Sequence, residues 1–192
     1  MQTSLLLSQF FRHPASIGSL VSSSPALAQT MVKALPSEVK RVVELGPGRG
    51  PITQALLDHG IAPENLLTLE ADASLAQALR RRLPHVQTVT ADARFVPFVL
   101  RDLGWPNQVD AVVSSLPLRN MAPHALEFLL GSVDRVLRPG GSLIQYTYGL
   151  RAPIADSACR ELGWRQYQLE TVWKNLPPAR VFRFVKGVTV RS

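Results

Sequence analysis

Residues 42–50, with the sequence VVELGPGRG, decide the fold of this chain. The run from Val42 to Leu45 is typical of a buried strand, and three glycines follow it at alternate positions. Glycine at positions 46 and 48 lets the backbone turn sharply and approach a ligand without a Cβ atom in the way. Pro51 suits the first position of a helix, whose free N–H groups would face the same ligand. The stretch predicts a strand, a ligand-binding turn and a helix, and its alternative interpretation is a Gly/Pro-rich turn without a ligand.

Length and composition predict one domain that spans residues 1–192. A chain of 192 residues with 46% hydrophobic and 18% charged residues can bury a full core. Cys159 is the single cysteine and has no partner for an intrachain disulfide, and no Cys/His cluster has the spacing of metal ligands. We therefore expect neither a structural disulfide nor a metal site.

The charge predicts an anionic partner, either a nucleic acid or a membrane surface. Lys and Arg number 21 and Asp and Glu number 14, for a formal net charge of +7. No apolar run reaches the roughly 18 residues of a membrane-spanning helix, so membrane contact would be peripheral. No basic residue precedes Arg12, and residues 11–14 interrupt the first apolar stretch, which opposes a secretory signal. These features predict a cytoplasmic protein.

Apolar runs alternate with amphipathic stretches along the chain, which is the pattern of a parallel sheet with crossover helices. Strands are expected at residues 41–45, 65–70, 85–90, 109–114, 142–147, 165–173 and 180–186. Helices are expected at residues 51–58, 73–82, 94–102, 123–137 and 153–162. The last two strands are separated by six residues, too few for a parallel crossover, so we expect them to form an antiparallel hairpin.

Acidic residues end two of the expected strands. Glu70 lies about twenty residues after the glycines, where an acid can accept hydrogen bonds from both hydroxyls of a ribose. Its alternative role is to cap the helix that begins near Asp72. Asp92 ends the next strand. The carboxyl ends of parallel strands share one edge of the sheet, where ligands bind in such folds.

The G-x-G-x-G spacing after an acid resembles motif I of the class I methyltransferases, which use S-adenosylmethionine (SAM). The resemblance implies a Rossmann-like α/β fold with a seven-stranded, mainly parallel sheet, a terminal antiparallel hairpin and N-terminal helices. It also implies that Glu70 holds the ribose of SAM and that Asp92 receives the adenine amino group. The SAM-binding residues that it implies are Glu44, Gly46, Pro47, Gly48, Gly50, Glu70, Ala71, Asp92, Ala93, Ser114 and Leu116.

The stretch from Ser114 to Leu118 indicates which class of methyl acceptor the chain uses. Methylases of adenine amines usually carry Pro-Pro-Tyr or a near variant here, whereas this chain has Ser-Ser-Leu-Pro-Leu. Without an aromatic residue, a flipped base would lack its stacking partner. We therefore expect no nucleic-acid substrate.

Three blocks together resemble the bacterial phospholipid N-methyltransferases: VSSLPL at 113–118, QYTYG at 145–149 and, most specifically, NLPPARV at 175–181. Residues 17–20 and 22–25 are similar to the start of that family as well. The resemblance implies methylation of a phospholipid amine such as that of phosphatidylethanolamine. It also implies peripheral association with an anionic inner membrane. Relatives that methylate ornithine lipids share much of the pattern.

The expected lipid site includes four residues near the last strands. Tyr148 is the first candidate for the acceptor pocket and Tyr146 the second, because a buried phenol can favour the neutral amine and its ring can attract a methylated cation. Arg180 would hold the lipid phosphate and Asn175 would orient the head group. The alternatives are ordinary sheet aromatics and a turn with a solvated arginine.

Two basic or amphipathic segments allow more than one interpretation. In residues 1–36, Leu5, Leu6 and Phe10 precede Arg12 at helical spacing, as in a helix that lies in a membrane interface or one that covers the cofactor cleft. The run Arg80–Arg82 would meet anionic head groups or would merely close a helix.

The rival functions are a methyltransferase of RNA or protein, and a noncatalytic SAM-binding or lipid-surface adaptor.

Overall fold

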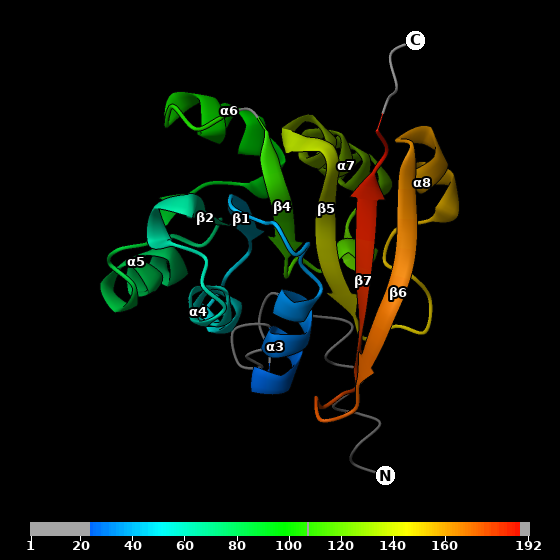
Figure 1. The fold of residues 1–192 in the computed structure, drawn as a ribbon, viewed down its shortest axis with the longest axis horizontal. Coiled ribbons are helices and arrows are strands. Elements are labelled where there is room, and N and C mark those ends of the chain that lie inside the picture. The colour runs from blue at the N-terminus through cyan, green and yellow to red at the C-terminus, as the bar shows by residue number, and fades with distance from the viewer. Residues whose placement is uncertain (1–23, 107, 189–192) are drawn as a thin grey trace.

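A computed structural model of the chain describes residues 24–106 and 108–188. They form a seven-stranded sheet in the order β3-β2-β1-β4-β5-β7-β6 (Figure 1). Strands β1 to β5 are parallel, and β7 runs antiparallel to both β5 and β6. The strands are β1 Val42–Leu45, β2 Leu66–Glu70, β3 Gln87–Thr90, β4 Val109–Ser114, β5 Leu137–Thr147, β6 Trp164–Val172 and β7 Ala179–Lys186.

Helices cover both faces of the sheet and bury two apolar clusters against it. Figure 1 shows α3 and α4 in front of the sheet and α7 behind it. The helices are α3 Pro25–Lys33, α4 Pro51–Asp58, α5 Ala73–Arg82, α6 Val96–Asp102, α7 Pro123–Val136 and α8 Asp156–Glu161. Short 3₁₀ turns lie at Pro63–Asn65, Ala93–Phe95 and Leu118–Asn120. The Rossmann-like fold class and the terminal antiparallel hairpin are confirmed.

The largest departure from the expected elements lies between α7 and β5. The strand was expected from residue 142, but β5 begins at Leu137, directly after the helix. Gly140 has φ of 76°, and a Cβ atom on Gly141 would lie 2.8 Å from the carbonyl oxygen of Arg138. The glycine pair therefore lets the irregular backbone pass close to the carbonyl oxygens of Arg138 and Asp110, so that the strand continues. The sequence Pro-Gly-Gly alone suggests a turn.

Helix α3 belongs to the core of the front face. Ser24 caps it by accepting a hydrogen bond from the amide of Leu27 at 3.2 Å, and Pro25 occupies its first position. Leu27 and Met31 are fully buried, so this part of the N-terminal segment packs on the sheet. The expected amphipathic residues Leu5, Leu6, Phe10 and Arg12 lie outside the described residues.

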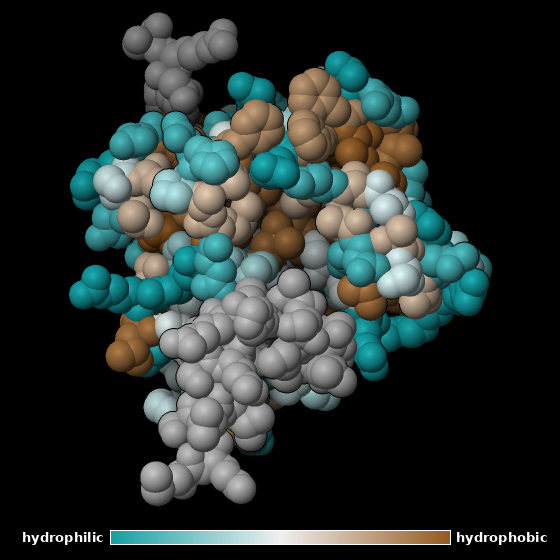
Figure 2. Space-filling view, turned by 180° about the vertical axis from the view of Figure 1, so that it is seen from behind, coloured by the Kyte–Doolittle hydropathy of each residue, from teal (hydrophilic) through white to brown (hydrophobic). Residues whose placement is uncertain are grey.

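Aromatic side chains gather on the rear face of the molecule. The rings of Phe95 and Phe128 are 6.1 Å apart and those of Phe95 and Phe98 are 6.3 Å apart, and about half of each side chain is exposed. In Figure 2 apolar side chains are exposed over α6 and α7 on this face. Among the described residues, no helix combines the length and the apolar character needed to cross a bilayer.

Candidate cofactor and acceptor site

The loop after β1 adopts a shape that its glycines make possible. Gly46, Gly48 and Gly50 have φ values of 70°, 55° and 78°, a region that other residues adopt at a cost. A Cβ atom on Gly46 would lie 2.8 Å from Cδ2 of Leu116, whereas one on Gly48 would meet open space. The buried Pro47 between them accepts a hydrogen bond from the amide of Gly50 at 2.8 Å. The loop is thus packed on the Leu116 side and open at Gly48.

Glu70 joins this loop to the end of β2. Its side chain is nearly buried, and its two carboxylate oxygens accept hydrogen bonds from the amides of Gly48 and Asp72, both at 3.0 Å. Asp72, rather than Glu70, caps α5, because its carboxylate accepts from the amides of Ser74 and Leu75. The capping role considered for Glu70 therefore belongs to Asp72, and Glu70 faces the glycine loop beside the exposed Ala71.

Asp92 and Ala93 stand at the end of β3, next to the end of β2. The amide of Ala91 donates to the carbonyl oxygen of Glu70 at 3.0 Å, which ties the two strand ends together. The Asp92 carboxylate pairs with the Arg94 guanidinium at 2.7 Å and accepts from the Arg94 amide at 2.8 Å. These hydrogen bonds hold the pKa of Asp92 below its usual value. Asp92 is therefore anionic and held in place at neutral pH.

Glu44 is a fully buried acid on β1, under the loop. Neither of its carboxyl oxygens has a hydrogen-bond partner of regular geometry, and the buried hydroxyl of Thr53 on α4 lacks one as well. Burial raises the pKa of Glu44 to about 8, and the nearby hydroxyl and amide of Thr53 offset a smaller part of that shift. A buried acid with only partial compensation is costly, so this carboxyl group indicates a further positive or hydrogen-bonding partner.

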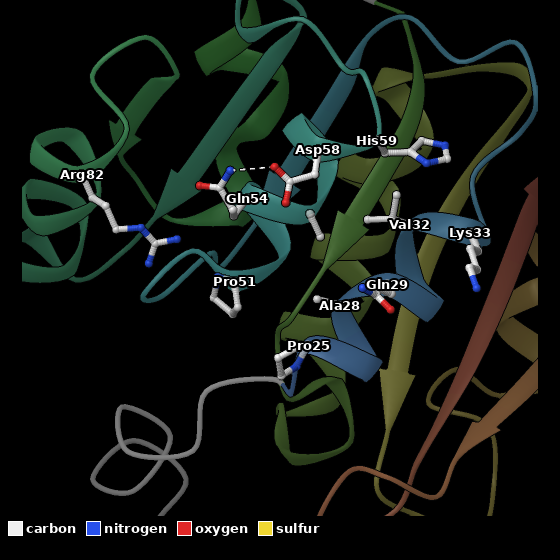
Figure 3. A pocket seen from close by; sticks show the side chains of 11 residues that line it. Pro25, Ala28, Gln29, Val32, Lys33, Pro51, Gln54, Asp58, His59 and Arg82 are labelled. Carbon is white, nitrogen blue, oxygen red and sulfur yellow. Dashed lines mark hydrogen bonds between the residues drawn. The ribbon is translucent and has the colours of Figure 1, made fainter.

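Arg82 clamps the glycine loop from α5. Its guanidinium donates to the carbonyl oxygens of Arg49, at 2.5 Å, and Gly50, at 3.0 Å. Figure 3 shows the side chain extending toward the start of α4, beside a groove of about 480 Å³ between α3 and α4. Arg80 of the same run bonds to the carbonyl oxygen of Thr88 and the hydroxyl of Thr90. Neither interpretation of the run Arg80–Arg82 anticipated these contacts.

The turn after β4 is fixed against the same loop. The amide of Ser115 donates to the carbonyl oxygen of Leu45 at 2.9 Å, and the Ser114 hydroxyl accepts from the amide of Leu116 at 3.3 Å. The Gln145 amide donates to the carbonyl oxygen of Leu116 at 3.0 Å. Ser114 and Leu116 thereby lie next to the glycine loop.

Tyr146 and Tyr148 form an edge-to-face pair at the end of β5. Their ring centroids are 5.4 Å apart, both rings are half-buried, and both pack on the cluster that includes α3 and α4. Burial raises the pKa of Tyr148, while hydrogen bonds with Asn175 and Tyr146 act in the opposite direction. Both tyrosines therefore lie on the front face.

Asn175 lies next to Tyr148, whereas Arg180 pairs in register with Thr147 and therefore lies on the opposite face of the sheet from the tyrosines. Asn175 is 3% exposed; its side-chain oxygen accepts from the amide of Ser24 at 3.2 Å, and its nitrogen donates to the carbonyl oxygen of Pro177 at 2.8 Å. Arg180 pairs with Thr147 across the sheet and donates to the carbonyl oxygen of Gly149 at 3.0 Å. Asn175 thus anchors the β6–β7 loop to the start of α3, and Arg180 anchors the chain after β5.

The residues at this edge fit SAM. The glycine loop leaves space at Gly48, Glu70 and Asp92 offer carboxylates at neighbouring strand ends, and the Glu44 carboxyl group lacks a partner. SAM carries hydroxyls, amines and a sulfonium, which are the groups that such acids recognise. Within residues 24–106 and 108–188, no group of three or more His, Cys, Asp and Glu side chains is arranged to hold a metal ion.

Comparisons with known proteins show the family of the chain. The model of a family described as a methyltransferase domain matches residues 42–141. An ornithine lipid N-methyltransferase from Singulisphaera acidiphila is 34% identical over 96% of this chain and 95% of that protein. A ribosomal RNA small subunit methyltransferase A from Acidobacterium capsulatum is 30% identical over 86% of this chain and 55% of its own length. A solved TehB-like SAM-dependent methyltransferase from Corynebacterium glutamicum matches with a TM-score of 0.64 and 17% identity, over 96% of this chain and 98% of that one.

Proposed function

We propose that this chain methylates the amine head group of a phospholipid such as phosphatidylethanolamine. The chain belongs to the SAM-dependent methyltransferases and uses SAM as its cofactor. It works as one domain over residues 1–192, on the cytoplasmic side and in peripheral contact with an anionic inner membrane. Residues 1–36 serve as a lid or as a membrane-contact segment.

The observation that carries this proposal is the tyrosine pair beside the cofactor loop. Tyr146 and Tyr148 are half-buried on the face that also holds Glu44, and β5 is separated from β1 only by β4. The turn from Ser114 to Leu118 offers no aromatic ring for stacking a base. The similarity to a lipid N-methyltransferase over nearly the whole chain supports the same acceptor class.

The acceptor amine must lose its proton before it can react. An amine of the lysine type has a pKa of about 10.4 in water and is protonated at neutral pH. A half-buried pocket disfavours the ammonium form, and a neutral phenol oxygen of Tyr148 can accept a hydrogen bond from the amine while the proton passes to water. The tyrosine faces then attract the increasingly methylated cation. Bound SAM supplies the electrophilic methyl group that the nitrogen lone pair attacks.

Arg180 is assigned to the lipid phosphate. A guanidinium has five N–H donors, so the bond to Gly149 leaves others for phosphate oxygens. Asn175 contributes to head-group orientation through the loop that it anchors to Ser24 and Pro177.

The function is tested by incubating the full chain with labelled SAM and separate lipids. Phosphatidylethanolamine, its monomethyl and dimethyl forms and an ornithine lipid are each dispersed in detergent, and ribosomal RNA and bulk protein are assayed in parallel. We expect label in the ethanolamine lipids. Label only in RNA or protein would refute the proposal, and SAM binding without any labelled product would indicate a noncatalytic adaptor.

Arg180→Ala tests the phosphate role separately. We expect lipid turnover to fall at least tenfold while the affinity for SAM is unchanged, because two charge-assisted hydrogen bonds are lost. Arg165→Ala, an exposed arginine of the same hairpin, is the matched control. A large loss of SAM affinity in Arg180→Ala, measured by calorimetry, would contradict the assignment.

A further inference from the structure

Three large apolar side chains stand in solvent on adjoining loops at the carboxyl edge of the sheet. Leu150 follows β5 and is 83% exposed; Trp173 and Leu176, in the loop between β6 and β7, are 76% and 87% exposed. The loops adjoin because Arg180, at the start of β7, bonds to the carbonyl oxygen of Gly149. Single exposed apolar residues are ordinary, but three in one region indicate an interaction surface. We call these three residues the apolar tip.

The backbone around the apolar tip carries basic residues without acids. Residues 115–125, 147–155 and 171–180, which contain the loops at this end of β4 to β7, include no Asp or Glu. Their basic residues are Arg119, Arg151, Lys174 and Arg180. Arg119, Arg151 and Lys174 are exposed. These loops therefore carry a net positive charge, which complements an anionic partner.

The rest of the carboxyl edge has a different character. The connections after β2 and β3 contain Asp72 and Asp92, and Glu70 ends β2. The β1–β3 half of the edge thus carries acids together with basic residues such as Arg49 and Arg94, whereas the loops of the β5–β7 half carry basic and apolar residues without acids. Figure 1 shows the β6–β7 loop extending past the end of β5 at this edge.

We infer that the apolar tip docks on an anionic bilayer, with Leu150, Trp173 and Leu176 in the lipid interface and the basic loops over the head groups. Tryptophan favours the membrane interface, and a positive surrounding attracts anionic lipids. Arg180, which is assigned to the lipid phosphate, bonds to Gly149 next to Leu150 and so lies close to the tip. This inference rests on the proposed lipid substrate and names the surface that meets the lipid.

The tip is tested by vesicle binding of the full chain, measured by sedimentation. The test vesicles contain phosphatidylcholine with an equal share of phosphatidylglycerol, and the reference vesicles contain phosphatidylcholine alone. We expect the triple variant Leu150→Ser, Trp173→Ser, Leu176→Ser to bind the anionic vesicles at least tenfold more weakly than the original chain. Its affinity for SAM, measured by calorimetry, stays unchanged and reports an intact fold. Leu169→Ser, on β6 outside the loop, is the matched control and keeps full binding.

Two further measurements separate the apolar and the basic contributions. The original chain should show a blue shift of tryptophan emission on anionic vesicles, and Trp173→Phe should lose most of that shift while it still binds. Arg151→Gln with Lys174→Gln should remove the preference for anionic over neutral vesicles. Both expectations follow from the exposure of these side chains.

The outcomes distinguish the docking surface from the function. Vesicle binding that is the same in the triple variant and the original chain overturns the docking surface, even if detergent-dispersed lipid is methylated. Binding of RNA that depends on the tip, with no binding of vesicles, overturns it as well. Vesicle binding that depends on the tip, without methylation of any lipid, supports the surface and refutes the proposed acceptor.

Discussion

Replacing Glu44 with Gln should remove a pH-dependent cost from the folded state. Glu44 is fully buried, and its pKa is about 8 in the folded chain against an ordinary value of 4.5. Between these two values, the unfolded chain has released the proton that the folded chain still holds. The unfolded state then binds fewer protons, so the stability of the original chain falls as the pH rises.

The magnitude follows from the two pKa values. A shift of one pKa unit corresponds to about 1.36 kcal/mol, so 3.5 units set a limit of about 5 kcal/mol at high pH. Over the practical range from pH 5 to pH 8 the loss is about 3 to 4 kcal/mol. The Glu44→Gln variant keeps a similar shape without the titration, and it should lack this part of the pH dependence.

Urea unfolding at several pH values between 5 and 8 measures the effect. We expect the stability of Glu44→Gln, relative to the original chain, to rise steadily over that range. Glu127→Gln removes an exposed glutamate of α7 and serves as the control. Parallel stability curves for Glu44→Gln and the original chain would refute the assignment of a buried, mostly protonated acid.

The Glu44→Gln substitution should weaken SAM binding, although it should stabilise the chain without SAM. If the Glu44 carboxylate balances a positive group of SAM, binding near pH 7 releases about one proton, which calorimetry detects as a dependence of the heat on the buffer. The Glu44→Gln variant should be more stable without SAM at pH 8, should bind SAM more weakly and should lose the proton release. Unchanged affinity and proton release in the variant would show that Glu44 does not sense the cofactor.

Two further variants test the loop. Gly46→Ala should lose about 1 to 2 kcal/mol of stability because alanine is strained in the left-handed backbone of this position, and its SAM affinity should fall because the new Cβ displaces Leu116. The control Gly104→Ala, where φ is 67° and a Cβ atom would meet open space, should lose similar stability and keep its SAM affinity. Arg82→Ala should weaken SAM binding about thirtyfold because two hydrogen bonds to the loop, worth about 1 kcal/mol each, are lost. Equal weakening in the control Arg81→Ala, measured by equilibrium dialysis, would exclude the clamp.

The fold could be predicted because its signals are local. The glycines after β1 need φ values that only glycine adopts cheaply, and the six residues between the last two strands leave no length for a crossover. The early start of β5 could not be predicted from the same signals. Gly140 and Gly141 are usual turn residues, and only their packing against Arg138 and Asp110 shows that the strand continues through them.

The site was less predictable where a side chain acts across the fold. Glu70 and Asp92 were predicted because strand ends in a parallel sheet share an edge. The Arg82 clamp joins positions 32 and 33 residues apart through α5, and a run of three arginines does not identify which one turns inward. The burial of Asn175 is equally nonlocal, since it depends on the amide of Ser24 at the other end of the chain.

The distribution of charge along the carboxyl edge connects the cofactor to the acceptor. A sulfonium donor is positive, and the β1–β3 half holds the carboxyl groups of Glu44, Glu70 and Asp92, of which Asp92 is paired with Arg94. The proposed phospholipid substrate presents a negative phosphate next to its amine, and basic residues such as Arg180 would favour that phosphate on the β5–β7 half. An amine held through its phosphate at Arg180 would have to pass the carboxyl edge of β5 to reach the tyrosine pair, because Arg180 pairs in register with Thr147 and the tyrosines lie on the other face of that strand.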